Sequence, residues 1–271
     1  MAEPDIEGLA ADLTSLESAV RQAAEAARPL FNTAFKRWEK SKGNPVTEID
    51  IAIDRMLRRE LMAARPSYGW LSEESVDDLS RMGHERVWIV DPIDGTLALV
   101  KGRPHFAISA ALALMGQAVA GCVFNPLTNE FFSAAHGHGA TLNDKRITVS
   151  ERAELQGARM LGAKDFFHHP EWRRPWPPLE IESRSSIAYR LALVAAGTWD
   201  ACVTLSGKSD WDLAAGDIIV REAGGCVSDH TGAAFCYNRE RTRHQSVIAA
   251  GPVLYAEILS RVAHIDLGRP R

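Results

Sequence analysis

Residues 88–96, WIVDPIDGT, place two carboxylates three positions apart directly after a short apolar run. The run is rich in β-branched and aromatic residues, which predicts a buried strand. A proline restricts the following backbone and Gly95 relaxes it, so Asp91 and Asp94 are expected in a tight turn. Thr96 then begins a predicted helix. A strand end with two acids beside a helix start can hold a divalent cation and a phosphate together.

The same residues also fit a simple turn with a helix cap, since Asp, Gly and Thr are common in turns.

Other acidic residues along the chain favour a metal site. Glu73 and Glu74 follow a predicted short strand at 70–72, and Asp212 begins a nearly apolar helix predicted over 211–223. If these acids met the two in the turn, they would repel one another strongly without cations. Oxygen ligands without histidine or thiol select Mg²⁺ or Mn²⁺.

Composition is that of an ordinary globular protein. The 271 residues are 46% hydrophobic and 24% charged, and this length fits one large domain or two small ones. A net charge of −4 predicts no general attraction to nucleic acid or to a membrane surface. The N-terminus lacks a secretory signal pattern, and the four cysteines form no Cys-x-x-Cys pair. We therefore expect a cytoplasmic protein whose cysteines are reduced and lie in the core. We expect it to bind neither nucleic acid nor a membrane.

The elements that must position these acids follow from apolar spacing. Helices are predicted over 6–29 and 50–65, with a polar loop at 40–45 between them. Short strands are predicted at residues 70–72 and 87–90. After the Asp-rich turn, strand-like runs joined by short turns predict an antiparallel meander. These runs are residues 106–114, 118–124 and 130–134.

In the second half, predicted strands alternate with predicted helices, which indicates a smaller α/β unit. The strands are residues 159–163, 199–205 and 246–250, and the helices are residues 185–196, 211–223 and 253–262. A loop at 165–180 is rich in proline, aromatic and basic residues. We predict a division into residues 1–150, an α+β part with most of the acids, and residues 151–271, an α/β part with Asp212.

Taken together, these motifs resemble the inositol monophosphatase family, which are magnesium-dependent, lithium-sensitive phosphatases. The resemblance covers about residues 10–260. The matching motifs, in chain order, are residues 45–50, 73–75, 88–96, 211–216 and 222–225. It implies a layered αβαβα sandwich, hydrolysis of a small phosphorylated metabolite, and a homodimer because relatives form one.

The resemblance also implies metal ligands. Glu73, Asp91 and the backbone carbonyl of Ile93 would hold one Mg²⁺. Asp91, Asp94 and Asp212 would hold a second, with Asp91 bridging. A third, weaker cation would sit near Glu73, so two or three Mg²⁺ are expected per site, with Mn²⁺ as a substitute.

Catalytic and substrate roles follow from the same resemblance. Thr96, paired with Asp50, would help Glu73 orient and deprotonate the attacking water. The amides of Gly95 and Thr96 would grip the phosphate at the helix start. Phosphoryl transfer leaves little covalent work for a protein, so positioning and charge neutralisation suffice.

The substrate is less determined. Inositol monophosphatases carry a glutamate before the second signature that contacts sugar hydroxyls, and the matching stretch 201–210 has none. Residues 47–50 and 71–74 are more similar to bacterial 3′(2′),5′-bisphosphate nucleotidases, which act on 3′-phosphoadenosine 5′-phosphate. Arg190 or Lys208 could bind a second phosphate, or both are surface residues. The aromatic loop at 165–180 could stack on a base or simply pack.

Other functions stay open at this point. Fructose-1,6-bisphosphatase and histidinol-phosphatase activities are weaker alternatives within the family. A haloacid dehalogenase-type phosphatase with an aspartyl nucleophile would need acids two apart, whereas here they are three apart. A regulatory binding protein of the same fold is the alternative from another class, and the retained acids favour catalysis over it.

Overall fold

The computed structural model describes residues 8–31, 35–41, 44–169 and 172–268. Ile6, expected in the first helix, lies outside these residues. The α-helices are α1 (Leu9–Phe31), α2 (Glu48–Ala64), α3 (Thr96–Val100), α4 (Lys164–Phe167), α5 (Ile187–Ala195), α6 (Asp210–Glu222) and α7 (Pro252–Val262). No helix among the described residues is long and apolar enough to cross a membrane.

The larger sheet has seven strands in sequence order, and only β3 and β4 run parallel. They are β3 (Gly69–Ser72), β4 (Arg86–Asp94), β5 (Ala107–Leu114), β6 (Gln117–Asn125), β7 (Glu130–Ala135), β8 (Gly139–Leu142) and β9 (Lys145–Arg146). The predicted antiparallel meander is therefore confirmed. Its hairpins form because short turns join adjacent apolar runs.

The smaller sheet has five strands and mixes parallel with antiparallel pairs. In spatial order they are β11 (Glu180–Glu182), β10 (Arg159–Leu161), β12 (Ala201–Thr204), β16 (Val247–Ala250) and β14 (Cys226–Ser228). Two short pairs complete the strands of the described chain: β1 (Arg37–Ser41) with β2 (Asn44–Thr47), and β13 (Lys208–Ser209) with β15 (Arg243–His244).

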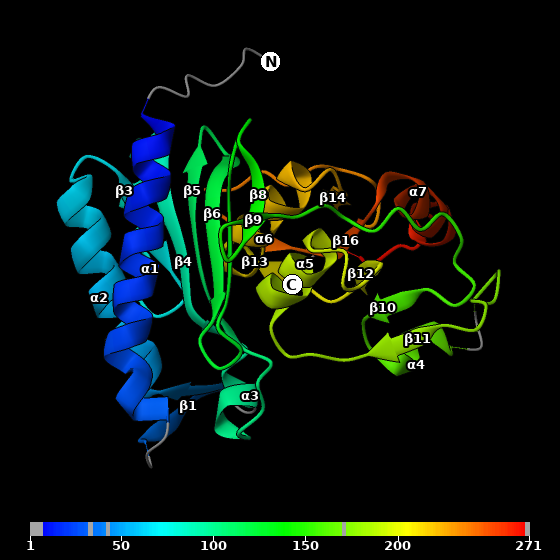
Figure 1. The fold of residues 1–271 in the computed structure, drawn as a ribbon, viewed down its shortest axis with the longest axis horizontal. Coiled ribbons are helices and arrows are strands. Elements are labelled where there is room, and N and C mark those ends of the chain that lie inside the picture. The colour runs from blue at the N-terminus through cyan, green and yellow to red at the C-terminus, as the bar shows by residue number, and fades with distance from the viewer. Residues whose placement is uncertain (1–7, 32–34, 42–43, 170–171, 269–271) are drawn as a thin grey trace.

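Five layers follow one another across the molecule (Figure 1). Helices α1 and α2 cover one face of the larger sheet, and α5 and α6 fill the space between the two sheets. Helix α7 covers the far face of the smaller sheet. The strands alternate accordingly: in β4, Ile89 packs toward α6 and Trp88 toward α2. The predicted αβαβα sandwich is thus confirmed.

The structure corrects three local predictions. Within the predicted polar loop 40–45, residues 40 and 41 belong to β1 and residues 44 and 45 to β2; these strands pair by backbone hydrogen bonds that need no apolar alternation. The predicted loop 165–180 contains part of α4 and the start of β11. Cys236, expected in the core, is exposed.

Helix α6 packs unusually close to the larger sheet at Gly121 of β6. A methyl group added there would lie 2.8 Å from Ala215 Cα and 2.8 Å from Ile218 Cγ2. Gly121→Ala is therefore expected to destabilise the fold by about 1–3 kcal/mol through overpacking. Urea unfolding measures this, with Gly83→Ala as the control because nothing lies within 4 Å of a Cβ at that position. Equal stability of the two variants would contradict the close packing.

Candidate metal centre and active site

Strand β4 carries the first two acids to the end of the larger sheet. The pairing of β4 with β5 shifts register between Asp91 and Asp94, so the strand is irregular where its carboxylates lie. Both side chains are buried. Asp91 also accepts a hydrogen bond from the Ile93 amide (3.0 Å), which holds its carboxylate within the turn.

Asp212 joins these two acids from another layer. One carboxylate oxygen each of Asp91, Asp94 and Asp212 lies within 4.8 Å of the other two. These three residues are called the aspartate triad below. Oxygen donors of this kind suit a hard divalent cation such as Mg²⁺.

The electrostatics of the aspartate triad favour a bound cation. Burial, followed by the charges of Glu73, Asp94 and Asp212, raises the pKa of Asp91 well above its ordinary value. Burial raises the pKa of Asp94 to about 6, although hydrogen bonds from Ser186 and Ala188 oppose this. Burial and then Asp94 raise the pKa of Asp212 to about 7. Three carboxylates this close are compatible with neutral pH when a cation neutralises them.

Helix α5 supports Asp94 from the second half of the chain. The Ser186 hydroxyl donates to Asp94 Oδ2 (2.7 Å), and the Ala188 amide donates to the same oxygen (2.6 Å). Ser186 is also the N-cap of α5 and accepts from the Tyr189 amide. We did not predict this contact, although a serine before an apolar helical run is a recognisable cap signal.

Asp212 is held by the start of α6. The helix begins at Asp210, slightly earlier than predicted, because Ser209 is its N-cap. Asp212, expected at the helix start, is its third residue and accepts from the Ser209 amide (2.7 Å) in a capping box. Asp210 is buried and forms a hydrogen bond with His244 Nε2 (2.7 Å). This contact stabilises the first turn of α6.

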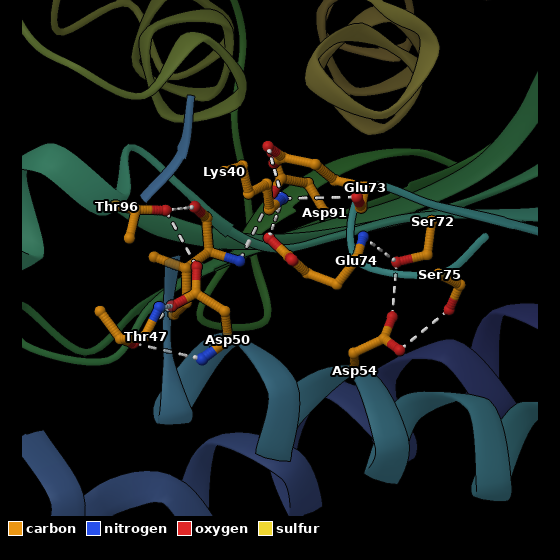
Figure 2. Close-up of polar contacts among 11 residues, drawn as sticks. Lys40, Thr47, Asp50, Asp54, Ser72, Glu73, Glu74, Ser75, Asp91 and Thr96 are labelled. Atoms are coloured by element: carbon orange, nitrogen blue, oxygen red, sulfur yellow. Dashed lines mark hydrogen bonds and ion pairs between the residues drawn. The ribbon is translucent and has the colours of Figure 1, made fainter. Parts of the chain in front are cut away.

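Glu73 follows β3 and lies outside the aspartate triad. Figure 2 shows Lys40, from the β1–β2 hairpin, pointing at Glu73 and Glu74. Its ammonium lies 3.2 Å from Glu73 Oε1 and 2.5 Å from Glu74 Oε1. Burial raises the pKa of Glu74 to about 7, and Lys40 opposes that rise. Lys40 was missed because nothing in its polar surroundings marks it in the sequence.

Thr96, Asp50 and Thr47 form a connected polar group, to the left of Asp91, Glu73 and Glu74 in Figure 2. The Thr96 hydroxyl lies 2.9 Å from Asp50 Oδ1 and 3.0 Å from the Ile93 carbonyl oxygen. The Thr47 amide donates to Asp50 Oδ2 (2.9 Å), which completes the capping box of α2. Burial raises the pKa of Asp50, while bonds from both threonines oppose the rise.

Gly95 occupies a position that only glycine fits. Its φ is +92°, and a Cβ would lie 3.0 Å from the His105 carbonyl oxygen and from the Ser186 amide. The turn between β4 and α3 therefore packs directly against the start of α5. This close approach places the first residues of α3 beside Asp94.

Arg190 and Lys208, the two predicted substrate-binding cations, lie on different elements. Lys208, in β13, opposes the rise in the pKa values of Asp94 and Asp212. Arg190 lies one helical turn after Ser186 and donates to the Arg184 carbonyl, while its buried Nε has no hydrogen-bond partner in the described structure. Both cations also oppose the rise in the pKa of buried Cys202. Lys208 thus lies near the acids, while both cations are partly buried and neither is an exposed surface residue.

Comparison with known proteins places this geometry in a family. A sequence model of the inositol monophosphatase family matches residues 10–266. An inositol-1-monophosphatase of Rhizobium meliloti is 40% identical, covering 71% of this chain and 75% of that protein. Nus factor SuhB of Pasteurella multocida is 32% identical, covering 89% and 94%. The crystal structure of suhB from Bartonella henselae aligns with a TM-score of 0.78 at 29% identity, covering 94% and 99%. The chain belongs to the inositol monophosphatase family.

Proposed function

We propose that this protein is a Mg²⁺-dependent phosphomonoesterase that hydrolyses a small phosphate monoester. The observation that carries the proposal is the aspartate triad, whose oxygens lie within 4.8 Å of one another although burial penalises their charge. Such an arrangement is costly without a function that uses it. Family membership supports a phosphatase.

The ligand assignment follows the family pattern and fits the donors present. Glu73, Asp91 and the Ile93 carbonyl would hold one Mg²⁺, and the aspartate triad would hold another, with a third near Glu73 and Mn²⁺ as a substitute. When bound, these cations would neutralise the phosphate and lower the pKa of the attacking water. Lithium inhibition is expected by family resemblance.

The protein's own groups would position the water and the substrate. Thr96 is held between Asp50 and the Ile93 carbonyl, so its hydroxyl can orient a water toward Glu73, the proposed proton acceptor. The amides of Gly95 and Thr96, at the start of α3, would bind phosphate oxygens. Lys208 and Arg190 would contact an anionic part of the substrate.

A phosphate-release screen tests the proposal. The four substrates are inositol 1-phosphate, 3′-phosphoadenosine 5′-phosphate, fructose 1,6-bisphosphate and histidinol phosphate, each with Mg²⁺ and with a chelator. We expect Mg²⁺-dependent release from inositol 1-phosphate or 3′-phosphoadenosine 5′-phosphate. The absence of release from all four would overturn the proposal.

Thr96→Val is expected to lower kcat about a hundredfold with little change in KM. The valine keeps the shape but removes the hydroxyl that links Asp50 to the turn, and positioned proton-transfer groups contribute roughly this much. Steady-state kinetics measure the effect, with Thr14→Val on the exposed surface of α1 as the control. If both variants kept full kcat, Thr96 would have no part in positioning the water.

A regulatory binding role is the second candidate, because several relatives are named Nus factor SuhB. A protein that acts by binding a partner would depend on its surface for that contact and would not require the aspartate triad. A cellular phenotype that survives Asp94→Asn, in a variant without phosphatase activity, would favour this role.

A further inference from the structure

A hollow of about 270 Å³ lies on the face formed by α4, the end of β12 and the chain after α7. Four of its lining residues are apolar or aromatic, Phe166, Trp172, Leu205 and Ile265, and the other two are His169 and His264. Apolar cavities of about 150 Å³ accommodate benzene. This hollow can therefore take one or two flat rings.

A short stretch of chain links the hollow to the aspartate triad. Leu205 lies four residues before Ser209, and four residues of extended chain span at most about 14 Å. The Ser209 amide donates to Asp212 Oδ2 (2.7 Å). A phosphate held at the acids would thus leave its alcohol group within reach of Leu205.

We propose that this hollow, called the ring pocket below, binds a flat, weakly polar ring on the leaving alcohol of the substrate. The inference rests on the phosphomonoesterase function proposed above. It narrows the substrate class to ring-bearing phosphate monoesters, in preference to phosphorylated polyols.

The chemistry of the lining favours a ring. A polyol placed against Leu205, Phe166 and Trp172 would lose water from hydroxyl groups that find few partners there. A flat ring instead buries apolar surface and gains edge or face contacts with the aromatic side chains. Leu205 lies within residues 201–210, the stretch that lacks a glutamate for sugar hydroxyls.

The aromatic wall is already in place. Phe166 contacts Trp172 edge-on with ring centroids 5.0 Å apart, and it contacts Phe167 at 4.8 Å. The Trp172 indole N–H donates to the Phe166 carbonyl (2.6 Å). Phe167 is buried and packs beside Gly162, where a Cβ would lie 2.8 Å from its ring. A wall held in this way loses little freedom when a ring binds.

The test compares 2-phenylethyl phosphate with glycerol 1-phosphate, two alkyl esters that differ mainly in the ring. With Mg²⁺ present, we expect kcat/KM to be about tenfold higher for the phenylethyl ester, the effect of one stacked ring. Trp172→Ala and Leu205→Glu should each lower the ratio of the two values to about one, whereas Trp172→Phe should keep most of it. Leu127→Glu, at a half-exposed position in the turn between β6 and β7 and outside the lining of the ring pocket, should leave both values unchanged.

Binding of the product alcohol gives a second readout that needs neither metal nor turnover. Addition of 2-phenylethanol should change the tryptophan fluorescence of the metal-free wild type and of Leu127→Glu, and have little effect on Trp172→Ala. Equal kcat/KM for the two esters, with no fluorescence change, would overturn the ring pocket but leave the phosphatase proposal intact. No hydrolysis of either ester, with a fluorescence change that Trp172→Ala removes, would count against the phosphatase proposal and for the ring pocket.

Discussion

Asp94→Asn is expected to lower Mg²⁺-dependent phosphate release about a thousandfold. The substitution removes a negative charge from the aspartate triad, whose oxygens lie within 4.8 Å of one another. An amide oxygen can still accept from Ser186 and Ala188, which bond the carboxylate at 2.7 and 2.6 Å. The fold should therefore survive while cation binding is lost.

Two measurements separate these effects. Phosphate release at saturating Mg²⁺ reports activity, and urea unfolding in a chelator reports the fold. Asp144→Asn is the matched control, because the Asp144 side chain is 89% exposed and lies in the turn between β8 and β9, outside the triad. Near-normal activity of Asp94→Asn at every Mg²⁺ concentration would contradict the assigned role.

The metal-free protein is expected to lose stability as the pH rises from about 4 to about 8. Burial and mutual repulsion raise the folded-state pKa of Asp94 to about 6 and that of Asp212 to about 7, and also raise that of Asp91. The folded state then binds more protons than the unfolded state across this range, so the free energy of unfolding falls with pH. Below about pH 4 both states are protonated and the penalty is absent. The total effect should be on the order of several kcal/mol.

Mg²⁺ should reverse this trend. A cation that binds the folded state stabilises it by mass action, and it binds best when the carboxylates are ionised. Urea unfolding at about pH 5 and about pH 8, with a chelator and with Mg²⁺, measures both effects. Asp91→Asn should flatten the metal-free pH dependence and abolish most of the Mg²⁺ stabilisation. A metal-free stability that rises over this range would show that the triad is not the dominant titrating group.

The sequence by itself determined the acids and the local elements that carry them. Residues 88–96 indicate a strand, a turn and a helix start, because apolar spacing, proline and glycine act over a few positions. The same holds for α2, whose capping box at Thr47 and Asp50 is encoded within four residues. The element order of the sandwich followed from the same short-range patterns, and the family resemblance then implied which acids meet.

Only the tertiary structure decided how distant segments complete the site. Ser186 reaches Asp94 across 92 positions of sequence, and Lys40 reaches Glu73 across 33. The ring pocket likewise joins Leu205 to Phe166 and His264 from separate elements. No local pattern encodes these contacts, because they depend on how α5 and α6 pack between two sheets. The acids could be predicted from the sequence because each lies in a motif of a few adjacent residues. The residues that hydrogen-bond to these acids, and those that would contact the substrate, depend on the packing of distant elements.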